Sequence, residues 1–351
     1  MRVAKAPWAT NRASVKGKLM ANAIPMVELW RGGMLESSHS GHAVICGADG
    51  EIVSSWGDPA AVIFPRSSCK MLQALPLIES GAAHAAGLTD AQLALCCASH
   101  QGAAIHTDMV TQWLGDLGLA EQDLRCGTHW PNDTPARNGL VLAGEKPCQI
   151  HNNCSGKHSG FLTLNRHLKA GSEYTEVDHP LQKAVKAAFE DVTGEPSPGY
   201  GIDGCSAPNF ATSVRGLARA MAYFATASET GDLRSRAAYR LTRAMAAYPE
   251  LVAGETRACT DLMRAMGGRV AIKTGAEAVF VAIIPDKRLG IAVKIMDGGT
   301  RAAEAAITSL LIRAGVLDAQ HPEAQKRLGT DLRNWRGFRV GELRLTAEFA
   351  A

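Results

Sequence analysis

No apolar run in this 351-residue sequence approaches the ~20 residues that a transmembrane helix needs. The sequence has little excess of positive over negative charge, because its net charge is only +3. No basic run extends beyond a few residues. Internal repeats and low-complexity linkers are missing as well. Apolar residues make up 46% of the chain, which is long enough to enclose a sizeable core. We therefore expect a globular protein with no membrane partner and no nucleic-acid partner.

Acidic residues are absent before Glu28, whereas five basic residues precede it. This beginning also lacks the continuous apolar core of a secretory signal. We interpret residues 1–25 as a polar N-terminal extension, with Met20 or Met26 as alternative starts. A disulfide framework is not indicated either, because nine cysteines are an odd number at irregular spacing. We expect free or metal-bound thiols in a reducing, cytoplasmic compartment.

Strand-like patterns occur toward both ends of the chain, and helix-like patterns occur between them. Thr89 and Gln92 have the spacing of a capping box, and a helix is expected from Pro180 until Gly194 closes it. The pattern predicts an α/β (α+β) fold whose sheet is built from N- and C-terminal segments, with a helical subdomain inserted. We expect an active site in the cleft between the sheet subdomain (26–66 plus 268–351) and the mainly helical subdomain (67–267).

Two short motifs bring a serine and lysines together. In Ser67-Ser68-Cys69-Lys70, a serine and a lysine three positions apart share one face of a helix. Lys273-Thr274-Gly275 precedes a strand-like run and would supply a second ammonium from the sheet. Both motifs together have the order and spacing of the serine β-lactamases and penicillin-binding hydrolases. They favour a serine amidohydrolase with Ser67 as its nucleophile.

A serine hydroxyl needs an adjacent base to attack at neutral pH. A lysine can be that base only when its pKa falls toward neutrality, through burial or a neighbouring cation. Lys70 would be the base, and Lys273 or a metal ion would be the neighbouring cation. In the alternative interpretation Ser67 caps a helix and Lys70 lies in solvent. We favour the catalytic interpretation because Lys273 is present.

A polar block from His151 to His158 is rich in side chains that bind metals. On a helix Cys154 and Lys157 share a face, and Cys205 is the natural distant thiol. Two thiolates and one nitrogen would leave an open position in a tetrahedral zinc shell. From the residues alone, a turn with a buried cysteine is the better interpretation, because a lysine must lose its proton to bind zinc.

The block from His151 to Gly160 resembles the Asn-Asn-Cys-Ser-Gly-Lys-His segment of the rhizobial-type L-asparaginases. Further blocks that resemble this family follow in consistent order between about Met26 and Ala314. They are Ala98–His100, Asp123–Gly127, Asp203–Cys205, Val252–Glu255 with Arg257, Cys259 and Thr260, Lys273 with Gly275–Ala276, and Val293–Ile295 with Asp297–Gly298. The resemblance implies a serine β-lactamase/glutaminase-like fold and the hydrolysis of L-asparagine to L-aspartate and ammonia.

The resemblance also implies roles for individual residues. Ser67 with Lys70, and Ser99 with Lys273, resemble the two serine–lysine pairs of the family. Its ligands for one Zn²⁺ per chain, which we expect to shape the substrate pocket, correspond to Cys154, Lys157 and Cys205. Contacts to the substrate or its surroundings correspond to Arg66, His158 and Asp203, and either Asp203 or Glu255 could receive the substrate ammonium. We also expect a homodimer.

The sequence departs from the family pattern at two places, of which the first matters little because Cys154 is the expected ligand. His151 stands where a cysteine is also familiar, and Ser99-His100-Gln101 is a poor Ser-x-Asn motif, which argues against a true β-lactamase. The alternatives are a glutaminase or β-lactamase-like amidase on the same scaffold. A catalytically silent zinc or amino-acid binding protein is the alternative from another class.

Overall fold

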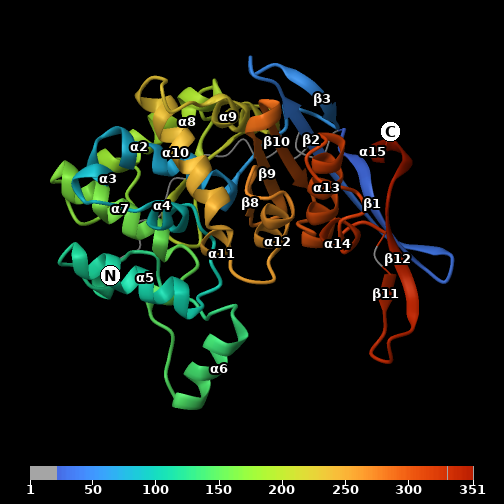
Figure 1. Ribbon diagram of the computed structural model, residues 1–351, viewed down its shortest axis with the longest axis horizontal. Coiled ribbons are helices and arrows are strands. Elements are labelled where there is room, and N and C mark those ends of the chain that lie inside the picture. The colour runs from blue at the N-terminus through green and yellow to red at the C-terminus, as the bar shows by residue number, and fades with distance from the viewer. Residues whose placement is uncertain (1–21, 330, 351) are drawn as a thin grey trace.

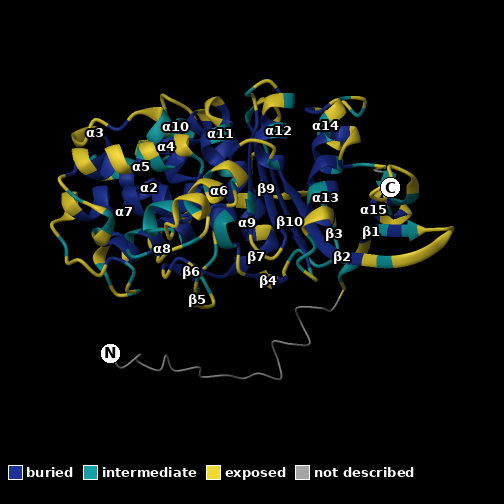
Figure 2. Cartoon of the chain, turned by 90° about the horizontal axis from the view of Figure 1, so that it is seen from below, coloured by how far each residue is buried: buried dark blue, intermediate teal, exposed yellow. Residues whose placement is uncertain are grey.

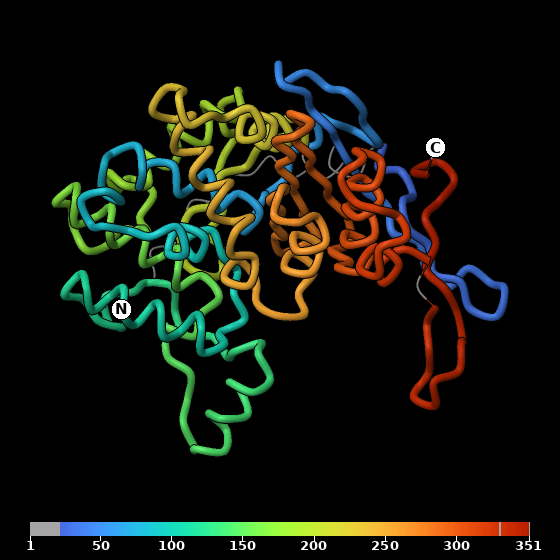
Figure 3. The backbone as a smooth tube through the Cα atoms, viewed as in Figure 1, coloured from blue at the N-terminus to red at the C-terminus, as the bar shows by residue number. Residues whose placement is uncertain are grey.

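The centre of the computed structural model, which describes residues 22–329 and 331–350, is an antiparallel sheet drawn from both ends of the chain (Figure 1). The eight strands are β1 (Ile24–Arg31), β2 (Met34–Cys46), β3 (Ile52–Trp56), β8 (Ala271–Gly275), β9 (Val279–Ile284), β10 (Leu289–Ile295), β11 (Asp331–Arg333) and β12 (Arg339–Leu345). Their order is β11-β12-β1-β2-β10-β9-β8, and β3 also pairs with β2. Figure 3 shows the first and last strands side by side, where Val27 pairs with Leu345.

The chain between β3 and β8 is mainly helical (Figure 1). Its helices are α2 (Lys70–Glu79), α3 (Ala82–Ala85), α4 (Asp90–Cys96), α5 (Ala104–Asp116), α6 (Thr134–Ala143), α7 (Ser155–Leu168), α8 (Pro180–Thr193), α9 (Val214–Thr226), α10 (Leu233–Ala247), α11 (Pro249–Val252) and α12 (Ala258–Ala265). Short ladders join β4 (Val62–Ile63) to β7 (Thr212–Ser213) and β5 (Tyr200–Ile202) to β6 (Pro208–Phe210). The 3₁₀ turns are η1 (Arg66–Cys69), η2 (Glu121–Asp123), η3 (Gln149–His151) and η4 (Pro285–Lys287). Helices α13 (Thr300–Arg313), α14 (Pro322–Gln325) and α15 (Ala347–Ala350) follow β10.

The central strands are buried on both faces, as the dark blue of β9 and β10 shows in Figure 2. All six residues of β9 are buried, so helices must cover both sides of the sheet. Helices α9 and α13 both pack against β9 and β10. At Gly290 the backbones of α9 and β10 meet, because a Cβ there would lie only 2.0 Å from the backbone nitrogen of Ala222.

The observed topology confirms the predicted α/β (α+β) architecture, with a sheet from both termini and helices inserted between them. The capping box is present, since the Thr89 side chain accepts from the backbone nitrogen of Gln92 at 3.3 Å. Helix α8 starts at Pro180, and Gly194 ends it in a left-handed conformation. Residues 1–21 of the expected extension lie outside the described residues, and the limits of the two subdomains stay a prediction. None of the described helices has the length and apolar character of a membrane span.

Candidate active site

The serine–lysine motif forms a tight turn that leads into α2. Ser67 is half-buried within η1, and Lys70, the first residue of α2, is only 1% exposed. Residues three apart eclipse one another in a 3₁₀ turn, so Ser67 and Lys70 lie on the same side. The hydroxyl of the neighbouring Ser68 is already hydrogen-bonded, since it donates to the carbonyl of Pro65 at 2.7 Å. The alternative, in which Ser67 caps a helix and Lys70 lies in solvent, is wrong. Lys70 is buried, and no side chain caps η1 or α2.

The structure brings Lys70 and Lys273, the lysines of both predicted pairs, together around the hydroxyl of Ser99. The amine of Lys273 donates to the Ser99 hydroxyl at 2.8 Å, and that of Lys70 approaches it at 3.2 Å. Lys70 also donates to the carbonyl of Ala98, and Lys273 donates to the carbonyl of Thr274 at 2.6 Å. Within the described chain no hydrogen bond joins Lys70 to Ser67. Hydrogen bonds of this kind often form only when substrate binds.

The surroundings of Lys273 favour its neutral amine. Burial lowers the pKa of Lys273 to about 7, and the charge of Lys70 acts in the same direction. A lysine with a pKa near neutrality can accept a proton as well as give one, which an exposed lysine cannot do at neutral pH. Lys273 therefore has the electrostatics of a general base that acts through Ser99.

The end of β8 lies directly against the turn that carries Ser67. A Cβ at Gly275 would lie 2.6 Å from the carbonyl oxygen of Pro65 and 3.0 Å from the backbone nitrogen of Ser68. Only glycine allows this approach of two backbones. The Lys-Thr-Gly tripeptide thus supplies an ammonium and also the contact surface on which the Ser67 turn rests.

The three expected zinc ligands also converge. Cys154 precedes α7, Lys157 lies in its first turn, and Cys205 lies between β5 and β6. The amine of Lys157 donates to the Cys205 sulfur at 3.1 Å, and Lys70 approaches the Cys154 sulfur at 3.1 Å. The thiol of Cys154 lies within hydrogen-bond reach of Cys205. The metal set and the serine–lysine cluster therefore meet at Cys154.

The sulfurs of this set suit a cation, whereas the ammonium of Lys157 competes with a metal ion for them. The hydrogen bond from Cys154 lowers the pKa of Cys205 well below its usual range, and the ammonium of Lys157 acts in the same direction. The same hydrogen bond raises the pKa of Cys154, together with burial. Burial opposes the charge of Lys157, but the two sulfurs outweigh it and raise its pKa. Nε2 of His158 is buried beside Cys205 without a hydrogen-bond partner in the described chain.

These donors fit a zinc ion in their chemistry, as two sulfurs and one amine with a buried ring nitrogen beside them. The third residue of the set is a lysine, where zinc sites commonly have histidine, cysteine or a carboxylate. Accordingly, no group of three or more His, Cys, Asp or Glu that could hold a metal occurs among residues 22–329 and 331–350. The fit therefore depends on deprotonation of Lys157.

The expected substrate contacts have three different sets of partners. Arg66 reaches Asp203 with Nε at 2.9 Å and Nη2 at 2.7 Å, so these two predicted contacts lie together next to Ser67. His158 is buried and bonded through Nδ1 to the Tyr174 hydroxyl at 2.9 Å. The exposed carboxylate of Glu255 pairs instead with Arg264 at 2.7 Å, and it forms no hydrogen bond with the serine–lysine cluster within the described residues.

Residues that the sequence motifs did not single out hold these groups in place. The Asn152 side chain accepts from the backbone nitrogen of Cys154 at 2.8 Å and donates to the carbonyls of Cys126 and Gly127. The backbone nitrogen of Ser99 donates to the carbonyl oxygen of Val252 at 2.9 Å, which holds Ser99 in position. The position of Asn152 inside the polar block was a signal that could have identified it.

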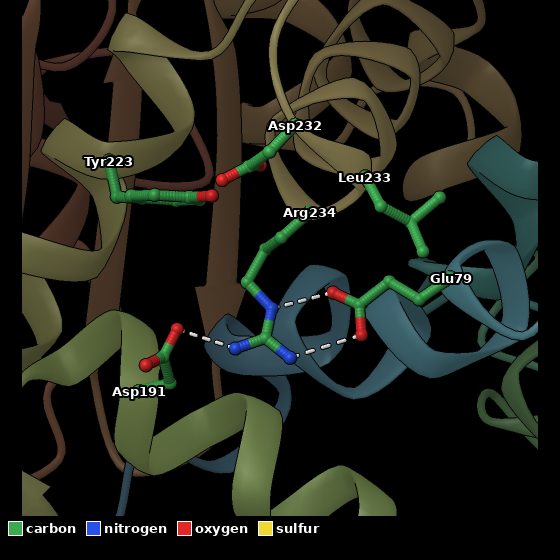
Figure 4. Close-up of a pocket in the computed structure, with 6 residues that line it drawn as sticks. All are labelled: Glu79, Asp191, Tyr223, Asp232, Leu233 and Arg234. Atoms are coloured by element: carbon green, nitrogen blue, oxygen red, sulfur yellow. Dashed lines mark hydrogen bonds and ion pairs between the residues drawn. The ribbon is translucent and has the colours of Figure 1, made fainter.

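Two cavities of about 410 Å³ each lie elsewhere. Figure 4 shows the first one, where Arg234 reaches between Glu79 and Asp191. Glu79 is the last residue of α2, whereas Lys70 is the first, so this cavity lies at the opposite end of the helix. Apolar and proline side chains around Ile52, Pro196 and Pro198 line much of the second. Neither cavity is lined by a predicted site residue.

Comparison with known families identifies the class of the protein. The family model described as L-asparaginase II matches residues 27–345, which together with the fold and the site defines an amidohydrolase. The chain belongs to the L-asparaginase II family, and this confirms the resemblance seen in the sequence blocks. No curated protein sequence matches the chain.

Solved structures are similar to the chain over most of its length at low identity. A β-lactamase from Mycobacterium bovis is 14% identical with a TM-score of 0.45, over 79% of this chain and 95% of that one. Mglu in its glutamate form is 14% identical with a TM-score of 0.45, over 79% of this chain and 61% of that one. A putative β-lactamase from Bacteroides dorei is 10% identical with a TM-score of 0.42, over 74% and 85%.

The pKa of Lys273 predicts how the hydrolytic rate depends on pH. Because only neutral Lys273 can accept a proton, kcat/KM for amide hydrolysis should rise as pH increases through about 7 and then level off. Initial rates across this range, with circular dichroism to confirm folding, measure the effect. Lys273→Arg keeps its proton and should lose the activity. A flat profile of the folded protein across pH 7 would contradict a neutral Lys273 in the reaction.

Proposed function

We propose that the protein hydrolyses L-asparagine to L-aspartate and ammonia through a serine-bound acyl-enzyme. The observation that carries this proposal is the buried cluster of Lys70, Ser99 and Lys273 beside Ser67, in a chain of the L-asparaginase II family. The homodimer and the cytoplasmic location stay predictions.

The proposed reaction begins with attack of the Ser67 hydroxyl on the side-chain amide carbonyl of asparagine. Lys70 takes the serine proton as a β-aspartyl ester forms, and the proton is later given to the departing ammonia. The contact of both amines with the Ser99 hydroxyl supports a relay, in which Lys273 takes a proton from Lys70 and restores it as a base. Water then hydrolyses the ester by the reverse proton movements.

The backbone N–H of Ser67 is proposed to stabilise the developing oxyanion. The first amides of a helix have no partner inside it. In η1 the amide of Arg66 donates to Asn209 and that of Ser68 donates to Pro65, so the amide of Ser67, the second residue of the turn, is the candidate donor. The nucleophile and this donor for its oxyanion would therefore come from the same residue.

The ion pair between Arg66 and Asp203 supports an amino-acid zwitterion as the substrate. Both side chains are partly or largely buried, with 28% and 12% exposure. The α-carboxylate of asparagine would replace Asp203 on Arg66, and its α-ammonium would replace Arg66 on Asp203. This exchange turns one ion pair into two and leaves neither side chain as a lone charge, which limits the desolvation penalty.

We propose that Cys154, Lys157 and Cys205 hold one Zn²⁺ per chain. When bound, the ion would supply positive charge that keeps both sulfurs as thiolates and favours the neutral amine of Lys157. The chain's own role here is to place Cys154 against Lys70 and Cys205 two residues from Asp203, so that the metal set borders the proposed substrate contacts.

The substrate is tested by supplying L-asparagine, L-glutamine and nitrocefin separately to the purified protein. Asparagine should release ammonia, and glutamine should react about 100-fold more slowly, because its extra methylene displaces the amide from Ser67 while the α-groups stay bound. Comparable kcat/KM for the two amino acids would identify a glutaminase-asparaginase. Turnover of nitrocefin would favour a β-lactamase-like amidase, and no turnover of any compound would favour a binding protein.

The nucleophile is tested with Ser67→Ala. Loss of a nucleophilic serine costs about a millionfold in kcat in a well-studied protease, so no turnover should remain measurable. Ser68→Ala is the matched control, since that hydroxyl is bonded to Pro65 and should be dispensable for turnover. Acid-quenched intact-protein mass spectrometry should show an aspartyl adduct on wild type only. An adduct on Ser99 in the Ser67→Ala variant would make Ser99 the nucleophile.

The metal is tested by elemental analysis of protein purified without added zinc. We expect one zinc per chain in wild type and in the control Cys148→Ser, whose half-buried thiol lies outside the ligand set. Cys205→Ser should lose the metal. Chelation should raise KM more than it lowers kcat, because the serine–lysine pairs supply nucleophile and base. Equal zinc in wild type and Cys205→Ser would remove Cys205 from the site, and no zinc in either would contradict the metal proposal.

A further inference from the structure

The turn between β8 and β9 has an unusual backbone for its sequence. Ala276, Glu277 and Ala278 connect Gly275 to Val279, which pair across the two strands. The φ angles of Glu277 and Ala278 are 60° and 56°, both in the left-handed region. Hairpin turns with two successive positive φ angles normally use glycine, asparagine or aspartate. Glutamate and alanine carry a Cβ that opposes this conformation, so the turn stores strain.

Consecutive residues of β10 hold both carbonyl groups of the strained pair. The amine of Lys294 donates to the carbonyl oxygen of Glu277. The backbone nitrogen of the next residue, Ile295, donates to the carbonyl oxygen of Ala278 at 3.1 Å. Strained residues persist only where the surroundings determine their conformation. Here one of the two determining contacts is a side chain, which a substitution can remove without altering the strand.

Lys294 is a costly residue for this position. It is only 9% exposed and lies on β10 opposite Val279. Burial lowers its pKa, the positive Arg66 adds to this, and Glu277 and Asp297 oppose it. Within the described chain Lys294 forms no ion pair, while Asp297 lies 2.5 Å from Nδ1 of His39. A buried amine is costly unless it is hydrogen-bonded, and in the described part of the chain Lys294 donates to the strained turn.

The strained turn adjoins the proposed active site through Gly275. This residue lies so close to the Ser67 turn that a Cβ would come within 2.6 Å of the Pro65 carbonyl oxygen. On the other side, the Glu277 carboxylate lies over Gly298, where a Cβ would be 3.1 Å from Oε2. If the turn relaxed, the end of β8 would no longer be fixed against the backbone of Ser68.

We propose that Lys294 is a positioning residue for the hydrolytic reaction. Through the Glu277 carbonyl it holds the β8–β9 turn in its strained form, and so it holds β8 against the turn that carries Ser67. The catalytic consequence rests on the function proposed above, whereas the effect on the turn does not depend on it.

The experiment compares Lys294→Met with the triple variant that also carries Glu277→Gly and Ala278→Gly. Methionine keeps much of the stem but cannot donate, so kcat for asparagine should fall about 10- to 100-fold, as expected for a misplacement of about 1 Å. KM should change less. The two glycines adopt positive φ without support, so the triple variant should regain most of kcat. Lys287→Met, which removes an exposed lysine at the other end of β9, is the control and should behave as wild type.

Amide hydrogen exchange of residues 275–279 provides a readout that needs no substrate. Exchange should be faster in Lys294→Met than in wild type or Lys287→Met. Unchanged exchange, or a loss of kcat that the two glycines do not rescue, would overturn the proposal. If Lys294→Met does not fold, the triple variant is compared with the double glycine variant, and a large difference in kcat between them would overturn it equally. If wild type hydrolyses no amide, the proposed function fails, while exchange still tests the support of the turn.

Discussion

The hydroxyl of Ser99 lies between two lysine amines that the protein has withdrawn from water, and the rest of the site depends on this contact. Buried amines are costly unless polar atoms receive them, and here the backbone carbonyls of Ala98 and Thr274 share that task with Ser99. Lys70 comes from a helix, and Lys273 comes from a strand some two hundred residues later in the sequence. The cluster can therefore form only when the sheet and the helical insertion are docked together.

Cys154 connects the cluster around Ser99 to the expected metal ligands Lys157 and Cys205. Its sulfur is approached by Lys70, and Cys205, which shifts the pKa of Cys154, is contacted by Lys157. A change in the charge of Cys154 therefore acts directly on Lys70. The Arg66–Asp203 ion pair provides a parallel connection, because Asp203 lies two residues from Cys205 and Arg66 adjoins Ser67. The expected metal ligands, the expected substrate contacts and Ser67 thus lie in one connected group of residues.

The sequence could predict what local spacing determines. The placement of Ser67 and Lys70 on one side of the same turn follows from helical geometry, and Pro180 and Gly194 mark the ends of α8 by their own backbone preferences. Ser99 follows a helix with no pattern of its own, so only family resemblance identified it. Glu255 was chosen for its charge, but the position of Arg264 on the adjacent α12 decides where that carboxylate binds. The sequence did not predict the left-handed turn at Glu277 and Ala278, because neither residue is one that such turns prefer.

Backbone strain is found on both sides of the contact between Gly275 and Ser68. Arg66 has a φ of 53° directly before Ser67, and Glu277 and Ala278 follow Gly275 with similar values. None of these three has an intrinsic preference for the left-handed region, so each conformation must be imposed by neighbours. Asn209 accepts from the backbone nitrogen of Arg66 at 3.3 Å, much as Lys294 donates to the carbonyl of Glu277. The buried sheet and helices supply the free energy that offsets this strain, and the geometry around Ser67 is consequently set by residues that never need to touch a substrate.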